Sequence, residues 1–177
     1  MGHYDLSNSS IHRTDLTPFD TKDFYVVTVI SNSQRFKSRY NLYRKFAKHM
    51  QDSGAQLITV ELQFGDRPFE LTDELYGKVV HLRSRQELWH KENMINIAMQ
   101  HLPDTWKYVA WIDADITFMR PDWVAETVQQ LQHYDFVQMF GTALDIGPHP
   151  HFDVISPHYG FMYCYQNQLQ NRDIPPL

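Results

Sequence analysis

The fold is decided by an unbroken run of β-branched and aromatic residues at positions 24–30, Phe24-Tyr25-Val26-Val27-Thr28-Val29-Ile30. The run shows no alternation of apolar and polar side chains, which is typical of a strand buried on both faces, as in a parallel sheet. It is far shorter than the ~20 residues that a membrane-spanning helix needs. We therefore expect a central strand of a soluble domain here.

The residues that follow this run alternate between helix and strand signals. Further strands are expected at 56–63, 79–82, 108–112 and 135–140. Helices are expected from Ser38, as N-cap, to about Asp52, from the capping-box pattern at 84–87 to Pro103, and from Pro121 to Leu131. This alternation predicts an α/β domain with a mainly parallel central sheet flanked by helices.

The first two expected helices have recognisable apolar faces. Leu42, Phe46 and Met50 recur every four residues in the first, and Gly54 is placed to end it. The apolar positions of the second are Leu88, Ile95, Met99 and Leu102. We expect these faces to cover the sheet.

Composition excludes several classes of protein. The formal net charge of −5 argues against a surface that coats nucleic acid, because phosphate binding needs clustered Lys and Arg. The first 20 residues have no apolar segment of a signal peptide, and the single cysteine, Cys164, has no partner for an internal disulfide. We expect a cytoplasmic protein without a membrane span.

The chain is expected to be one domain preceded by a polar arm. Residues 1–22 are polar and without periodicity, and we interpret them as an N-terminal arm; residues 23–140 form the α/β domain. Residues 141–177 form a loop-rich segment of the same domain, with one more strand at 158–165. The Gly/Pro-rich part, 141–157, is predicted to be a mobile lid that becomes ordered on ligand binding.

The chemistry is indicated by Asp113-Ala114-Asp115, which follows the expected strand at 108–112. Ligands of open α/β sheets bind outside the carboxyl ends of the strands. Two carboxylates at this spacing can converge on a hard divalent cation, and such a cation can hold a diphosphate. The competing interpretation is that the two Asp residues only cap the following helix.

The segment Trp111-Ile-Asp-Ala-Asp-Ile-Thr-Phe118, preceded by Lys91-Glu-Asn-Met-Ile-Asn96, resembles the nucleotide-sugar half of GT-A-fold glycosyltransferases of the Asp-x-Asp type. The opening Val29-Ile-Ser-Asn32, followed by Ser38-Arg-Tyr-Asn-Leu-Tyr43, is similar to small glycosyltransferases of large DNA viruses. The resemblance covers residues 24–165 and implies a Rossmann-like GT-A fold whose acceptor half is short or missing. A viral protein of this kind would act in the host cytoplasm.

The resemblance also implies a donor site. Ser31 and Asn32 would line the nucleobase and ribose pocket, and Glu61 would contact base or ribose. Arg83 and Lys91 would face the uracil or the diphosphate. The alternatives are that Ser31 and Asn32 are turn formers and that the three charged residues are ordinary strand-end or helix-face charges.

The same resemblance implies a metal site. Asp113 would contact the ribose and the metal shell, and Asp115 would bind Mn²⁺ or Mg²⁺ directly. The third ligand of such sites is often a histidine, for which His158 or His151 are the candidates, with His149 beside them. Trp111 is expected in the core.

No catalytic base can be assigned from the residues, and Asp145 and Asp153 are the candidates for an acceptor-facing carboxylate. The resemblance predicts a glycosyltransferase that moves a sugar from a nucleoside-diphosphate sugar, with UDP preferred, to a glycan, protein or small-molecule acceptor.

Two other functions stay open. The first is a nucleotide-sugar-binding module without a complete acceptor site. The second is a phosphatase of the haloacid-dehalogenase type, because Asp113-x-Asp115-x-Thr117 fits its nucleophile motif. Against the phosphatase, no lysine follows Asp115, although such enzymes need a later lysine motif.

Overall fold

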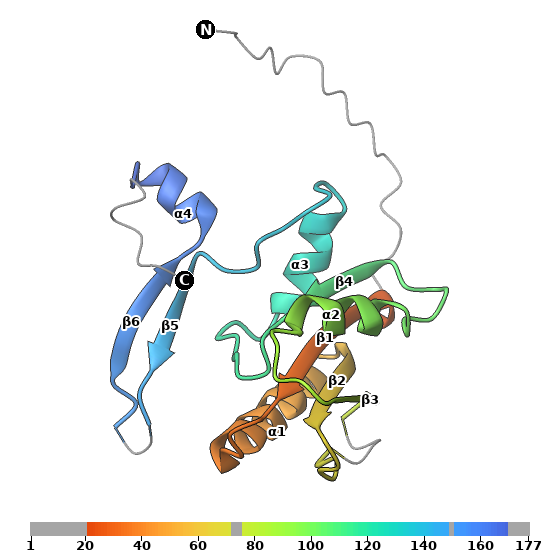
Figure 1. Cartoon of the computed structure of the whole chain (residues 1–177). Coiled ribbons are helices and arrows are strands. Elements are labelled where there is room, and N and C mark those ends of the chain that lie inside the picture. The colour runs from red at the N-terminus through yellow and green to blue at the C-terminus, as the bar shows by residue number, and fades with distance from the viewer. Residues whose placement is uncertain (1–20, 72–75, 149–150, 170–177) are drawn as a thin grey trace, which may run out of the picture. The chain divides into compact units, whose positions relative to one another are not determined.

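The computed structural model describes residues 21–71, 76–148 and 151–169. The chain divides into two compact units, of which the first ends at His133 and the second begins at Tyr134 (Figure 1). The expected N-terminal arm at 1–22 lies outside the described residues except for its last two positions, which begin a 3-10 turn at Thr21–Asp23.

The first unit is an α/β unit with a four-stranded parallel sheet in the order β3-β2-β1-β4. Its strands are β1 (Phe24–Ser31), β2 (Gln56–Phe64), β3 (Lys78–Ser84) and β4 (Tyr108–Trp111). All four were predicted from the sequence. The central pair β1 and β2 is buried almost throughout, as the continuous apolar runs predict.

Three helices flank this sheet: α1 (Lys37–Asp52), α2 (Lys91–Met99) and α3 (Trp123–Leu131). Alternate residues of β2 show that α1 and α2 lie on opposite faces, since side chains alternate along a strand. Ile58 and Val60 form a core cluster with Met94 of α2. Between them, Thr59 lies on the other face and shares a 3.0 Å hydrogen bond with Tyr43 of α1.

The C-terminus of α1 is a Schellman motif, in which Gly54 has the left-handed φ of 79°. The Ala55 N–H donates to the Met50 carbonyl at 3.1 Å, and the Gly54 N–H donates to that of Gln51 at 3.0 Å. The prediction that Gly54 ends this helix is confirmed.

Two details of α1 were predicted wrongly. Phe36 rather than Ser38 is the N-cap residue, and it makes no side-chain cap. Leu42 is 43% exposed, because the buried face of α1 is formed by Tyr40, Tyr43 and Phe46 together with Ala47 and Met50. Four-residue spacing alone did not show that Tyr40 and Tyr43, and not Leu42, belong to the buried face.

The capping box at 84–87 is also wrong, because α2 begins at Lys91. Ser84 is the last residue of β3, and its hydroxyl bonds the backbone of Gln86 instead of opening a helix. Leu88 consequently lies outside the helix and is exposed. The later apolar residues Ile95 and Met99 do pack against the core cluster.

The second unit contains an antiparallel hairpin of β5 (Thr142–Ile146) and β6 (Val154–Tyr159), followed by the short helix α4 (Phe161–Gln166). The expected strand at 135–140 is absent, and this segment is irregular. The expected loop at 141–157 is largely the hairpin, and the expected strand at 158–165 ends at Tyr159 and continues as α4.

In the part of the chain that the structure describes, no helix is both long and apolar enough to cross a membrane.

Candidate functional site

The strand order of the first unit defines a topological switch point between β1 and β4. From β1 the chain moves outward through β2 to β3, and it then returns to the other side of β1 as β4. The two connections therefore diverge at the carboxyl ends of β1 and β4. In open α/β sheets this divergence leaves the crevice in which ligands bind.

The Asp113-Ala114-Asp115 segment leaves β4 at this switch point. Its position is fixed by β1, because the Ile112 N–H donates to the Val27 carbonyl at 3.0 Å and the Thr28 hydroxyl donates to the Ile112 carbonyl at 2.7 Å. The side chain of Asp113 is 57% exposed, and Asp115 is exposed as well. Both carboxylates thus face solvent at the end of a rigid strand.

Lys91, the first residue of α2, brings a cation to the same place. Its Nζ lies 2.6 Å from Oδ1 of Asp113. The expected site residues Lys91 and Asp113 are therefore brought together, and Asp115 follows Asp113 two residues later in the same segment. The carboxylates can bind a divalent cation, and the lysine can bind a phosphate that this cation coordinates.

The carboxylate pair is compatible with the metal that the resemblance implies. A hard cation such as Mg²⁺ is commonly bound by one or two carboxylates, with water and phosphate oxygens as its other ligands. Asp113 and Asp115 supply two such groups. Within the described ranges, no group of three or more His, Cys, Asp or Glu side chains could hold a metal ion, so a complete protein-only cage is absent there.

The loop that follows Asp115 is anchored by a histidine that the sequence analysis did not single out. Nε2 of His49 in α1 accepts a 3.1 Å hydrogen bond from the Phe118 N–H, which requires the unprotonated nitrogen. Phe118 stacks on Trp123 of α3 at 4.2 Å between ring centroids. Burial lowers the pKa of His49, which favours the neutral form that this bond needs.

Two exposed tryptophans occur next to the site residues in the sequence. Trp111, expected in the core, is 68% exposed at the end of β4, and Trp89, two residues before Lys91, is 78% exposed. The Trp89 indole N–H donates to Glu92 at 3.0 Å, which lowers the pKa of that carboxyl. Exposed indole rings offer apolar faces for stacking.

Ser31 is the last residue of β1, and Asn32 begins the turn that follows it. Asn32 is buried, and both atoms of its amide are used, with Nδ2 donating to the Phe36 carbonyl at 2.9 Å and Oδ1 accepting from the Phe36 N–H at 3.0 Å. The Ser31 carbonyl accepts from Arg39. Asn32 therefore holds the loop in shape, as the turn-former interpretation predicts.

Glu61 lies inside β2, fully buried, and not at the strand end. One carboxylate oxygen accepts hydrogen bonds from Tyr40, Gln63 and the Glu70 N–H, and the other accepts from the Leu71 N–H. Burial and the charge of Glu61 raise the pKa of Tyr40. The acceptor sites of Glu61 are directed at the protein itself, so its observed role is to hold the loop after β2 against α1.

Arg83 is separated from the aspartates by the width of the sheet. It lies near the end of β3, at the opposite edge from β4, and three strand spacings correspond to about 14 Å. Its Nη1 donates to the carbonyls of Gly65 and Arg67 at 2.6 and 2.7 Å. The structure thus brings Lys91, but not Arg83, to Asp113.

The remaining candidates belong to the second unit. Nε2 of His158 and Oδ2 of Asp145 are 2.8 Å apart, as diagonal neighbours across the hairpin. Asp153 and His151 are exposed near the hairpin turn, and His149 lies outside the described residues. The pairing of Asp145 with His158 was not predicted, because the hairpin that creates it was not expected from the sequence.

Comparison of the chain with protein-family models, with curated proteins and with solved structures finds no match. The functional conclusion therefore rests on the residues and on the geometry at the switch point.

Proposed function

We propose that this chain is a metal-dependent glycosyltransferase domain that uses a nucleoside-diphosphate sugar, with UDP as the preferred nucleotide. The observation that supports the proposal is the placement of Lys91 against Asp113 at the switch point, with Asp115 two residues further along. The motif resembles the Asp-x-Asp segment of GT-A enzymes, and it lies where the topology leaves a ligand crevice.

Each group of this site has a distinct part in donor binding. Asp113 and Asp115 would hold Mn²⁺ or Mg²⁺, which when bound neutralises the diphosphate and the charge that develops on the leaving group. Lys91 carries a positive charge that can pair with a phosphate oxygen. The exposed rings of Trp89 and Trp111 offer stacking surfaces for a nucleobase or for the apolar face of a sugar.

The experiment is a thermal-shift screen of UDP and UDP-sugars, with either manganese or an excess of chelator. Two adjacent carboxylates repel a diphosphate unless a cation lies between them, so the stabilisation should be larger with metal. A ligand at a hundred times its dissociation constant adds about 2.7 kcal/mol to the free energy of unfolding. The measured quantity is the metal-dependent increment, which is the melting shift with manganese minus the shift with chelator.

The decisive variant is Asp115→Asn. Because Asp115 is exposed and not packed in the core, the fold should persist while the metal-dependent increment disappears. Asp104→Asn, another exposed aspartate but located before β4, is the matched control and should keep the increment. An increment that survives in Asp115→Asn would remove Asp115 from the metal site. The helix-cap interpretation does not apply in that case either, because α3 begins at Trp123 with Asp122 as its N-cap residue.

Turnover distinguishes the transferase from a nucleotide-sugar-binding module. Release of UDP from the stabilising UDP-sugar, with water or an added sugar as acceptor, is expected for a transferase. Metal-dependent binding without any UDP release over hours would support the binding module instead.

A further inference from the structure

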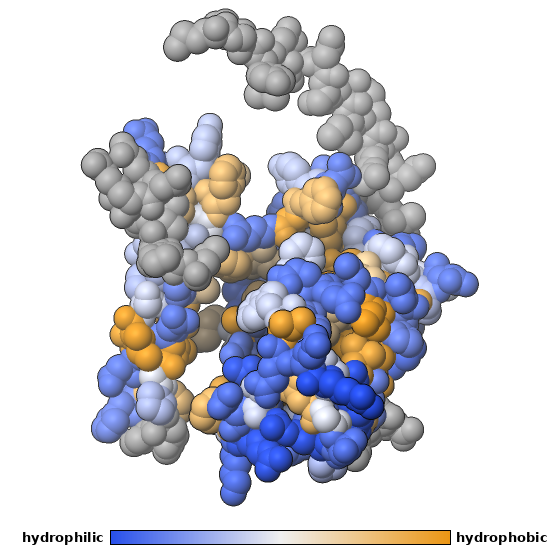
Figure 2. Space-filling model, viewed as in Figure 1, coloured by the Kyte–Doolittle hydropathy of each residue, from blue (hydrophilic) through white to orange (hydrophobic). Residues whose placement is uncertain are grey.

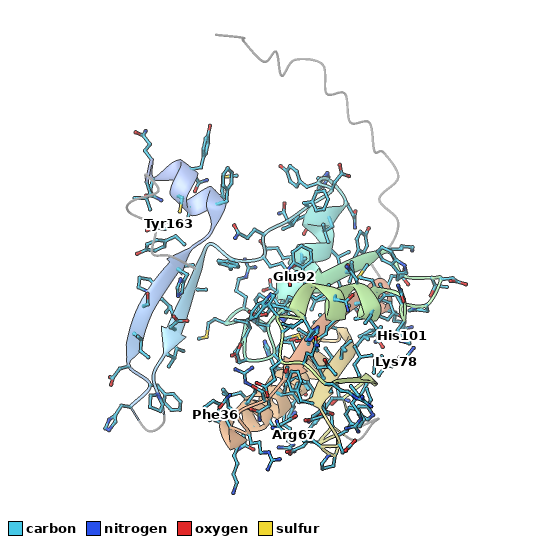
Figure 3. The ribbon with its side chains drawn as sticks, viewed as in Figure 1. Phe36, Arg67, Lys78, Glu92, His101 and Tyr163 are labelled. Atoms are coloured by element: carbon cyan, nitrogen blue, oxygen red, sulfur yellow. The ribbon has the colours of Figure 1, made fainter. Side chains whose placement is uncertain are left out.

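The carboxyl ends of β1, β2 and β3 carry a concentration of positive charge, although the whole chain has a formal net charge of −5. Three arginines, here called the arginine row, lie along this part of the edge: Arg39 in the first turn of α1, Arg67 in the loop after β2, and Arg83 near the end of β3. The corresponding surface of the first unit is mostly hydrophilic in Figure 2. Figure 3 shows Arg67 at the same end of the unit as Phe36.

Backbone carbonyls hold the first two arginines in place. Nη1 of Arg39 donates to the Ser31 carbonyl at 2.9 Å, and Nη1 of Arg67 donates to the Ser33 carbonyl at 2.8 Å. Both acceptors belong to the end of β1 and the turn that follows it. The two guanidinium groups thus bond carbonyls that are two residues apart in the chain, which places them on the same part of the edge.

Arg83 is the most constrained of the three. Besides its bonds to the Gly65 and Arg67 carbonyls, its guanidinium carbon lies 4.6 Å from the ring centroid of Phe69. Because Nη1 bonds the carbonyl of Arg67 itself, Arg83 and Arg67 are neighbours in the row. A guanidinium fixed in this way loses little side-chain entropy when it binds a further group.

The arginine row keeps unused capacity for an anion. A guanidinium has five N–H donors, and in each arginine only Nη1 is used by the bonds to the backbone. None of the three arginines forms an ion pair with a carboxylate in the described ranges. Their charges are therefore not balanced by described acidic side chains.

The N-terminus of α1 adds to the same positive potential. Its N-cap residue Phe36 makes no side-chain cap, and its first turn has no acidic residue. The unpaired N–H groups and the helix dipole favour an anion there. This feature reinforces the arginine row, which begins in that same turn with Arg39.

We propose that the arginine row is a second, metal-independent anion site that takes a phosphate-bearing small molecule, such as a phosphate monoester or a diphosphate. Planar guanidinium groups with free donors match the tetrahedral oxygens of phosphate. Arg83 lies about 14 Å across the sheet from the end of β4, whereas Arg39 and Arg67 extend the row to the end of β1, next to β4. The described ion pair of Asp113 is with Lys91 and not with the row, so anion binding by the arginines does not need a cation held by Asp113 and Asp115. The site is independent of the proposed transferase activity.

The experiment measures the binding of inorganic phosphate and pyrophosphate by titration calorimetry, with excess chelator and at constant ionic strength. The native chain should bind pyrophosphate more tightly than phosphate, and sulfate comparably to phosphate because the two share charge and shape. The double variant Arg39→Gln/Arg67→Gln should weaken binding about tenfold or more, since it removes two charge-assisted contacts. Arg44→Gln is the matched control, an exposed α1 arginine outside the row, and should change binding less than about twofold.

Two further variants separate the effect of charge from that of geometry and replace the double variant if needed. Arg67→Lys retains the charge but loses the planar fork, and should weaken binding by an intermediate factor. Arg39→Gln alone serves if the double variant fails to fold, because Arg39 is exposed. The proposal is overturned if the native chain does not bind either anion at millimolar concentration, or if Arg44→Gln weakens binding as much as the row variants. Asp115→Asn should bind both anions like the native chain, which separates a failure here from a failure of the proposed transferase site.

Discussion

Replacing Glu61 with glutamine tests whether this residue holds the fold or contacts a nucleotide. The substitution keeps the size of the side chain and removes one acceptor oxygen together with the charge. The groups that hydrogen-bond the carboxylate do so as donors: the hydroxyl of Tyr40, the amide of Gln63, and the backbone N–H groups of Glu70 and Leu71. Nε2 of His81 lies 3.5 Å from the oxygen that accepts from Leu71. The new amide group of glutamine must therefore face at least one of these donors.

The least costly orientation places the amide nitrogen opposite the Leu71 N–H, because the other oxygen position accepts three hydrogen bonds. The buried Leu71 N–H then loses its acceptor, and the other three donors bond a neutral amide oxygen instead of a charged carboxylate oxygen. A lost bond to a charged acceptor and a buried unpaired donor together cost about 3 kcal/mol. For a chain of this length, that loss corresponds to a melting temperature roughly 6–12 °C lower.

The assay combines urea unfolding with UDP binding in the presence of manganese, for Glu61→Gln and for the control Glu87→Gln. Glu87 is exposed, so its substitution should change the free energy of unfolding by less than about 0.5 kcal/mol. For Glu61→Gln, we expect the stability loss without a matching loss of UDP affinity once the folded fraction is taken into account. Unchanged stability with lost UDP affinity would refute the structural role and restore the ribose contact that the resemblance implies.

Two further predictions concern stability. His49 has a lowered pKa in the folded state, so below about pH 6.5 the unfolded chain binds more protons and the free energy of unfolding decreases as the pH is lowered. Urea midpoints should therefore be lower at about pH 5.5 than at about pH 7.5. The difference should be smaller in His49→Gln, which lacks the titrating ring next to Phe118. Gly77→Ala should cost about 2 kcal/mol or more, because Gly77 has φ +126° and a Cβ there would lie 2.3 Å from the Leu57 carbonyl oxygen. Gly65→Ala, with φ +60° and no atom near the new Cβ, should cost only about 1 kcal/mol in the same denaturation series.

The parallel sheet was predictable because its strands carry their signal locally. The run at 24–30 is buried on both faces, and a continuous apolar stretch is what such a strand requires. The carboxylates at the end of β4 followed from the same logic, since polar residues directly after a buried strand lie at the carboxyl edge. The contact of Asp113 with Lys91 could not be predicted, because it depends on the strand order, which no local sequence pattern indicates.

The errors arose where tertiary contacts override a local pattern. Ser84 fits a capping box, but pairing with β2 extends β3 to this residue and uses it as a strand end. Glu61 looks like a strand-end charge, but α1 brings Tyr40 to it and the following loop brings two backbone N–H groups. The hairpin of the second unit was missed because the glycines and prolines at 141–157 indicate a loop. β5 and β6 are stabilised by pairing with each other, and no local sequence pattern indicates that pairing.

The strand order gives the carboxyl edge of the first unit two electrostatic characters. At the β4 end, Asp113 and Asp115 present exposed carboxylates, whereas Arg83 lies at the β3 end. Arg67 lies between them, because its guanidinium bonds the turn after β1 and its carbonyl accepts from Arg83. The two ends of the sheet are separated by about 14 Å, which exceeds the Debye length of about 8 Å at physiological ionic strength. Arg83 and the aspartates therefore attract their own counter-charges with little influence on each other. It follows that metal dependence should belong to ligands held by Asp113 and Asp115, and salt-sensitive, metal-free anion binding to the arginine row, so that the two properties can be removed by separate substitutions.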